Sequence, residues 1–281
     1  MREIPYELCD VFTDRALAGN ALAVFVEADE LEGVTMQALA RETNLSESAF
    51  ILRAGSASAD ARIRIFTPTM ELPFAGHPTL GAAFVLAARR QRDTLNLETG
   101  RGLVNVHLQH RAGMASFGWM SQPLPKIEPY DHEGELLSAL RVTGSALPVE
   151  LYDNGPHYVF VERDSPEEIA ALAPDLARLA ALGSTAFSVY AKKEGRWKCR
   201  VFAPGEGIAE DPATGAAAGP LAVHLARHGR IAFGEEIVIE QGVEVGRPST
   251  LHARAMGSRD RLEAVEGGGQ AVLVGEGTFR F

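Results

Sequence analysis

The chain has 281 residues, 46% hydrophobic and 23% charged, with a formal net charge of −10, which suits about two globular domains and excludes a disordered chain. The acidic balance argues against a nucleic-acid or anionic-membrane partner, which needs clustered Lys and Arg, and no stretch approaches the roughly 20 apolar residues of a membrane span. Two cysteines, Cys9 and Cys199, cannot form a disulfide framework, and the first ten residues lack the apolar core of a signal peptide, so we expect a cytoplasmic protein with reduced thiols.

In the first half, short runs that alternate or are rich in β-branched residues predict strands. These strands cover residues 7–12, 21–26, 49–52, 61–66, 103–108 and 115–119. Apolar residues at helical spacing predict a helix over 35–42. A second helix is predicted from Pro78, and residues 78–88 carry no charge, which places this helix inside the protein.

The second half repeats this plan. Strands are predicted over 158–162, 187–191, 197–202, 237–239 and 271–274, and helices over 167–172 and 177–182. Residues 212–223 are again uncharged and predict a second buried helix, which starts at Pro212. Pro220 lies well inside it, where a proline removes one hydrogen bond at a cost of about 3 kcal/mol. The sequence leaves open whether this helix kinks or splits.

One longer pattern recurs after about 135 residues. FTPTMELPFAGHPTLGAA (66–83) aligns with FAPGEGIAEDPATGAA (202–217), so that His77 matches Asp211 at an offset of 134. Two upstream pairs keep the same order at offsets of 135 and 137. We interpret this as one supersecondary plan used twice, with each half a set of strands wrapped around one buried central helix.

The boundary between the halves is predicted near residues 121–135. This segment has three prolines and four carboxylates and no apolar period, which is typical of a linker. We expect a first domain over 1–125 and a second over 126–281. The sequence leaves open whether the last strand, near 270–281, returns to the first domain. A long loop within one domain is the alternative.

Both central helices are predicted to start in the same way. GHP (76–78) and DP (211–212) stand at the starts, followed by small residues up to Gly81 and Gly215. A helix start leaves about four unpaired N–H donors and a positive dipole end, and small residues let a ligand approach them. If the two starts face each other, a carboxylate could be bound from both sides. The alternative is that Pro and Gly only mark helix ends.

Three titratable side chains are candidates for proton transfer. His77 and Asp211 hold the same offset in both copies, so an imidazole and a carboxylate could hold or relay a proton. Glu47 lies between a predicted helix and a predicted strand, and it could act as a base if a dry cleft raised its pKa from about 4.3 to roughly 6–7. The alternatives are a structural histidine before a proline and a solvated or helix-capping glutamate.

Two other motifs are weaker. Gly205-Glu206-Gly207 begins like a dinucleotide fingerprint, but Glu210 stands where the third glycine belongs, so nicotinamide or flavin binding is not supported. His224 and His228 are four residues apart and could face together on a helix, but no third ligand is nearby. No metal site and no cofactor are therefore predicted.

The chain resembles the PhzF-like isomerase family of phenazine biosynthesis. The matching stretches run in the family's order over nearly the whole length and are DVFTDRALAGNALAVF (10–25), ETNLSESAFI (42–51), FTPTMELPFAGHPTLGAA (66–83), NGPHYVFV (154–161), FAPGEGIAEDPATGAAAG (202–219) and QGVEVGRPS (241–249). The resemblance implies a diaminopimelate epimerase-like fold of the α+β class. Its two pseudo-symmetric domains each have a mixed, strongly curved sheet wrapped around a buried central helix. The resemblance also implies a homodimer.

The resemblance implies roles for the candidate residues. Glu47 falls on the family's catalytic acid/base, and His77 and Asp211 fall on its supporting proton-handling pair. Gly76, His77 and Gly215 fall on backbone positions that bind the substrate carboxylate.

One position departs from the family, which usually has serine where this chain has Ala216. The backbone N–H of Ala216 can still bind the substrate, while a hydroxyl is lost. Relatives of the same fold that epimerise amino acids carry a cysteine at each helix start. Here those places are His77 and Asp211, and Cys9 and Cys199 lie elsewhere, so a two-thiol mechanism has no nucleophiles.

Three hypotheses follow. The first is a cofactor-free isomerase in which Glu47 moves a proton, and with it a double bond, on a small carboxylic acid. The second is a two-base epimerase of an amino or hydroxy acid that uses His77 and Asp211. The third, prompted by Ala216, is a non-catalytic protein that binds a small carboxylate.

Overall fold

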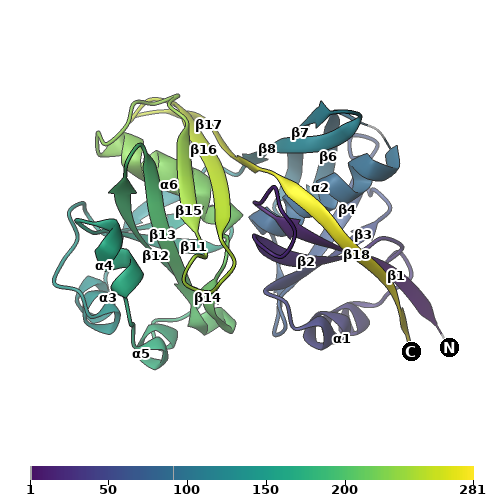
Figure 1. The fold of residues 1–281 in the computed structure, drawn as a ribbon, viewed down its shortest axis with the longest axis horizontal. Coiled ribbons are helices and arrows are strands. Elements are labelled where there is room, and N and C mark those ends of the chain that lie inside the picture. The colour runs from purple at the N-terminus through teal and green to yellow at the C-terminus, as the bar shows by residue number, and fades with distance from the viewer. Residues whose placement is uncertain (1, 91) are drawn as a thin grey trace. The chain divides into compact units, whose positions relative to one another are not determined.

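The computed structural model describes residues 2–90 and 92–281. It divides into two compact units, the first made of Met1–Ser121 with Gly268–Phe281 and the second of Gln122–Gly267. The chain therefore leaves the first unit after Ser121 and re-enters it at Gly268 (Figure 1).

The first unit is a mixed sheet around one central helix. Its strands are β1 (Glu3–Val11), β2 (Asn20–Phe25), β3 (Glu47–Leu52), β4 (Ala61–Phe66), β5 (Glu71–Leu72), β6 (Thr94–Thr99), β7 (Gly102–Arg111), β8 (Met114–Gln122) and β18 (Ala271–Arg280), and its helices are α1 (Gly33–Thr43) and α2 (Gly76–Arg90). The helix α2 packs against β1, β2, β3 and β6, and every residue of it from Gly76 to Ala87 is buried. A helix without charges over three turns is stable only in such a place.

The second unit repeats the arrangement. Its strands are β9 (Lys126–Pro129), β10 (Glu150–Asp153), β11 (His157–Glu162), β12 (Ala186–Lys193), β13 (Arg196–Ala203), β14 (Ile208–Asp211), β15 (Ile237–Gln241), β16 (Ser249–Gly257) and β17 (Leu262–Gly269). Its helices are α3 (Glu133–Leu140), α4 (Pro166–Ala171), α5 (Leu176–Ala180) and α6 (Gly215–Arg227), with one 3₁₀ turn at Pro204–Glu206. The central helix α6 is buried from Gly215 to Ala226.

Strand pairing confirms the duplication and the α+β class. In the first unit β18, β1 and β2 pair antiparallel, β2 and β3 parallel, β3 and β4 antiparallel, β4 and β6 parallel, and β6 and β7 antiparallel. In the second unit β9, β10, β11, β12, β13, β15 and β16 pair in the same succession of directions. The two halves of the sequence thus encode one topology.

The segment 121–135, where the boundary was predicted, has secondary structure of its own, and the two units divide after Ser121. Within it, β9 pairs with β10, and α3 starts at Glu133. The buried side chains of α3, Leu136, Ala139 and Leu140, have helical spacing, but they lie beyond the Pro-rich and acidic segment. A four-residue strand such as β9 is defined by its partner, so its own residues carry little signal.

Pro220 neither splits nor ends α6, because side chains replace the hydrogen bond that the proline removes. The missing N–H would have bonded to the carbonyl of Ala216, four residues earlier. Asn154 Nδ2 donates to that carbonyl at 2.9 Å, and Gln122 Nε2 donates to the carbonyl of Gly215 at 2.8 Å. Asn154 is buried, and it therefore stabilises the first turn of the helix.

We expect Asn154→Ala to lower the free energy of unfolding by about 1–3 kcal/mol, since it leaves a buried carbonyl without a donor. In a Pro220→Ala background, the new amide N–H of residue 220 can donate to the Ala216 carbonyl. In that background Asn154→Ala should therefore lower the free energy of unfolding by about 1 kcal/mol less. Urea unfolding of the four proteins in this double-mutant cycle measures the difference. Additive losses would show that Asn154 does not compensate for the proline.

Candidate active site

In the first unit, three buried polar side chains meet where three elements begin. Asn20 is the first residue of β2, Glu47 the first of β3 and His77 the second of α2. Glu47 Oε2 and Asn20 Nδ2 each lie 3.4 Å from His77 Nδ1. Their exposed fractions are 2% for Asn20, 7% for Glu47 and 2% for His77, so Glu47 is neither solvated nor a helix cap. Sequence reasoning missed Asn20, although it stands in the matching stretch over 10–25.

His77 is a neutral imidazole in this cluster. Burial lowers its pKa from 6.5 to about 3, so its contact with Glu47 is not an ion pair at neutral pH. With the Asn20 amide oriented to donate, His77 Nδ1 is an acceptor and the ring proton is on Nε2. His77 Nε2 is buried and has no hydrogen-bond partner among the described residues. The Nδ1 lone pair therefore lies on the side of Asn20 and Glu47, where the Asn20 amide donates to it, and the ring has an N–H donor on the other side.

We expect His77 to make the protein less stable in acid. The folded state keeps the imidazole neutral down to about pH 3, whereas the unfolded chain takes up a proton below about 6.5. The unfolded state then binds more protons, so stability is full above about pH 6.5 and falls as the pH falls, by up to about 1.4 kcal/mol per pH unit. His77→Gln should remove this component of the slope in urea unfolding between pH 7 and pH 4. His132→Gln, at an exposed site, should keep it, and equal slopes for wild type and His77→Gln would contradict the assignment.

In the second unit, Asp211 ends β14 and is held by the turn that leads to α6. Its Oδ2 accepts a 2.7 Å hydrogen bond from Thr214 Oγ1, and its carbonyl accepts one of 2.7 Å from Gln241 Nε2. Gln241 also accepts from the Thr214 N–H at 3.1 Å and donates to Thr214 Oγ1 at 2.9 Å. Asp211 is 5% exposed, so this turn places a buried carboxylate just before the helix.

The two helix starts differ from the prediction. The helix α2 begins at Gly76, which makes Pro78 its third residue, and α6 begins at Gly215, with Thr214 as its N-cap. Pro212 therefore lies in the turn and is not the first helical residue. The hydrogen bond between Asp211 and Thr214 closes this turn. The sequence alignment of the two repeat copies does not predict the turn.

The predicted carboxylate-binding backbone is buried in both units. Gly76 opens α2, and Gly215 and Ala216 open α6. The first N–H groups of a helix have no partner within it, so each start offers donors. The carbonyls of Gly215 and Ala216 are bound by the Gln122 and Asn154 side chains, which fixes the peptide planes of this turn.

Two acidic side chains near Asp211 have different roles. Burial and the negative charge of Asp211 raise the pKa of Glu206, so it is a second acid beside this turn that sequence reasoning did not single out. Arg200 donates two hydrogen bonds to Glu210, at 2.9 and 2.6 Å, so Glu210 is a structural ion-pair partner. Glu210 stands where a dinucleotide fingerprint would need glycine, and its structural role here is to accept this bidentate pair of hydrogen bonds from Arg200.

The cysteines are not candidates for catalysis. Cys9 and Cys199 are both buried. Burial raises the pKa of Cys9 far above its usual value and that of Cys199 to about 12. Neither thiol forms the thiolate that a nucleophile requires.

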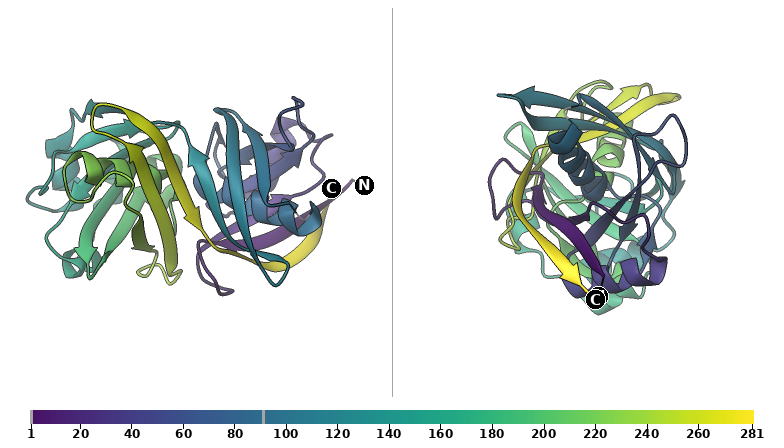
Figure 2. Two further views of the ribbon diagram at one scale, coloured as in Figure 1. Left: turned by 90° about the horizontal axis from the view of Figure 1, so that it is seen from above. Right: turned by 90° about the vertical axis from the view of Figure 1, so that its right-hand side faces the viewer.

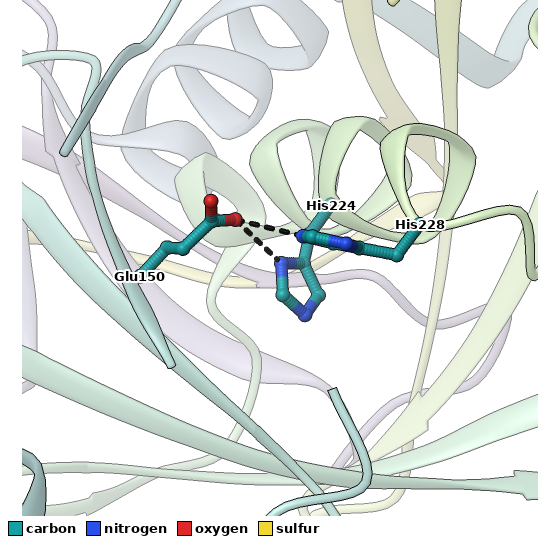
Figure 3. A group of neighbouring side chains, drawn as sticks. All are labelled: Glu150, His224 and His228. Atoms are coloured by element: carbon teal, nitrogen blue, oxygen red, sulfur yellow. Dashed lines mark hydrogen bonds and ion pairs between the residues drawn. The ribbon is translucent and has the colours of Figure 1, made fainter. Parts of the chain in front are cut away.

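The prediction that the pair His224 and His228 lacks a third ligand is wrong. Glu150, 74 residues earlier in the chain (224 − 150), brings its carboxylate to both rings (Figure 3). Proximity in the sequence was the wrong test, because β10 delivers this glutamate to the face of α6.

Nearly the whole chain matches one known family. The family described as "Phenazine biosynthesis-like protein" matches residues 9–277. The chain belongs to this PhzF family. A trans-2,3-dihydro-3-hydroxyanthranilate isomerase of Pseudomonas aeruginosa is 47% identical over 272 residues, 97% of this chain and 98% of that one. The isomerase of the same name from Pseudomonas chlororaphis is 46% identical over 274 residues, 98% of each chain.

Solved structures agree with this assignment. A predicted epimerase from Pseudomonas aeruginosa is 33% identical, with a TM-score of 0.83 over 98% of this chain and 99% of that one. A hydroxyproline epimerase from Agrobacterium vitis, with a TM-score of 0.68 at 14% identity over 99% and 92% of the two chains, shares the fold. The PhzF-family chain is therefore an isomerase with a small-molecule substrate and an epimerase-like fold. Among the described residues, no helix has the length and apolarity needed to cross a membrane.

Proposed function

We propose that the chain isomerises trans-2,3-dihydro-3-hydroxyanthranilate by cofactor-free acid/base catalysis at Glu47. The observation that carries this proposal is the identity of 47% over 97% of the chain to an isomerase named for that compound. The buried cluster of Glu47, His77 and Asn20 supports the chemical part. The homodimer implied by the resemblance and the cytoplasmic location expected from the cysteines and the first ten residues stay predictions.

The name of the compound defines the chemistry required. Carbons 2 and 3 of the ring are saturated, and the remaining two double bonds are conjugated with each other. Loss of a proton from carbon 3 gives an anion that is delocalised over the diene. Return of the proton to another ring carbon shifts the double bonds, so the reaction needs one group that gives and takes protons and no redox cofactor.

Glu47 is the group that we assign to both proton transfers. As a carboxylate, Glu47 accepts the proton from the first carbon, and as the acid it returns the proton to the second. The proton must therefore leave and return on the same face of the ring. After the first transfer, the protonated carboxyl group can donate to His77 Nδ1, 3.4 Å away, in place of the Asn20 amide. Asn20 keeps that nitrogen an acceptor, so it acts as a positioning residue.

Asp211 and the two helix starts receive the remaining roles. Asp211, and Glu206 beside it, can hold a proton in the second unit. The N–H groups of each helix start, at Gly76 in the first unit and at Gly215 and Ala216 in the second, are suited to bind a carboxylate, an interaction that is worth roughly 0.3–1 kcal/mol, and up to about 2 when partly buried. Ala216 offers only its backbone, whereas a serine would add a hydroxyl.

The test is turnover of trans-2,3-dihydro-3-hydroxyanthranilate by the tag-free protein in deuterated water, followed by absorbance and NMR. We expect a change in the absorbance of the conjugated diene and one deuterium on a new ring carbon. Deuterium entering an amino or hydroxy acid with inversion, and without a double-bond shift, would instead identify the two-base epimerase. A raised melting temperature with no exchange would identify a binding protein, and either outcome would overturn the proposal.

A further inference from the structure

A row of polar contacts joins β10 to the central helix α6. Glu150 and Tyr152 of β10 and the following Asn154 alternate along the chain, so their side chains share one face of the strand. They reach, in that order, His228, which is the C-cap of α6, and His224 and Ala216 within the helix. We call these six residues the polar seam.

One end of the polar seam has the composition of a metal site. Figure 3 shows both imidazoles turned towards one carboxylate oxygen. Glu150 Oε2 lies 2.9 Å from His228 Nε2 and 3.6 Å from His224 Nδ1, and the donor atoms all fall within 4.8 Å of one another. In a tetrahedral site with bonds of about 2.1 Å, donors are about 3.4 Å apart. Small shifts of the side chains would admit an ion.

The surroundings fit an ion that enters from solvent. The His224 side chain is fully buried, whereas those of His228 and Glu150 are 13% and 18% exposed, so one side of the cluster is open. Arg227 Nη2 lies 3.8 Å from the other carboxylate oxygen, Oε1, which leaves Oε2 to the histidines. The Tyr152 hydroxyl, 3.0 Å from Glu150 Oε2, can orient the carboxylate as an outer-shell partner. The charge of Arg227 weakens cation binding, and we expect micromolar affinity.

We propose that Glu150, His224 and His228 bind one divalent transition-metal ion, most suitably Zn²⁺, with water as the fourth ligand. Two imidazoles and one carboxylate are a ligand set that suits zinc. The site stands nine residues along α6 from Gly215 (224 − 215), about 14 Å at 1.5 Å per residue. The ion would therefore fasten α6 to β10 and take no part in the chemistry at the first turn of α6.

The competing explanation is a hydrogen-bond network without an ion, in which His224 Nδ1–H donates to the Tyr152 hydroxyl and this hydroxyl donates to Glu150. The experiment titrates tag-free, EDTA-treated protein with Zn²⁺ by calorimetry and with Co²⁺ by visible absorption. We expect one equivalent of each metal, visible bands of a four-coordinate Co²⁺, and a melting temperature raised by roughly 5 °C at a hundredfold excess over Kd.

Two variants and a control locate the site. Glu150→Gln keeps the shape of the side chain and His228→Ala removes a partly exposed ligand, and each should weaken metal binding at least about 100-fold. His252→Ala removes a histidine that pairs with Glu236 at 2.7 Å in another part of the unit, and it should bind metal like the wild type. Circular dichroism checks that each variant is folded. No binding by the wild type, or undiminished binding by a folded Glu150→Gln, would overturn the proposal.

Discussion

Glu47→Gln is expected to lower kcat for trans-2,3-dihydro-3-hydroxyanthranilate by about 10²–10⁴-fold, the usual contribution of a positioned acid/base group. The amide is nearly the same size as the carboxyl group but can neither accept the proton nor return it. Because the side chain is buried and contacts His77, water cannot readily replace it. The measurement is the initial rate of isomerisation and of deuterium incorporation.

The control for this substitution is Glu42→Gln, on the exposed surface of α1 five residues earlier. It removes the same charge from the same unit and should leave kcat unchanged within about twofold. The melting temperature of Glu47→Gln shows whether the protein is folded. Undiminished exchange or isomerisation by a folded Glu47→Gln would remove this residue from the mechanism.

Gly242→Ala is expected to be strongly destabilising, lowering the free energy of unfolding by at least about 3 kcal/mol. Gly242 has φ +77°, and a Cβ there would lie 2.4 Å from the Pro212 carbonyl oxygen and 2.4 Å from that of Arg247. Both atoms belong to backbone and cannot rotate away. The neighbouring Gln241 holds Asp211 and Thr214, so the displacement should reach the turn before α6 and lower kcat too.

Gly246→Ala separates steric overlap from backbone strain. Gly246 lies in the same loop with φ +72°, but a Cβ added to it would meet no heavy atom of the described residues within 4 Å. We expect Gly246→Ala to lower the free energy of unfolding by about 1–2 kcal/mol, the strain of placing an alanine in the left-handed conformation. We expect kcat to be unchanged. Urea unfolding compares the two variants, and equal losses would show that the contact with Pro212 does not matter.

Periodicity and charge predicted the elements that are buried over their whole length. The uncharged segments at Pro78 and Pro220 form α2 and α6, and the β-branched runs form the strands beside them. Prediction failed where a distant partner decides the structure. The strand β17 contains Gly267, Gly268 and Gly269, which have little strand propensity of their own, so the sequence alone indicates only a turn there.

The candidate site was predictable in composition but not in contacts. Glu47 and His77 were selected from the motifs, and the structure brings them together within the first unit. Asn20 carried no signal of its own, because an asparagine before a strand is ordinarily a turn residue. Glu150 could not be joined to His224 and His228 from sequence, since only the fold determines which strand crosses the helix.

The order of the units along the chain has a consequence for biosynthesis. The strand β18 runs beside β1, with Glu3 opposite Arg280 and Val11 opposite Ala271 (Figure 2), and the chain reaches it only after the whole of Gln122–Gly267. On the ribosome the second unit is continuous and can fold as soon as it emerges. The first unit, although translated earlier, must keep the β18 edge of β1 open until β18 itself has been translated, and this edge is exposed to chaperones and to mispairing with other nascent strands.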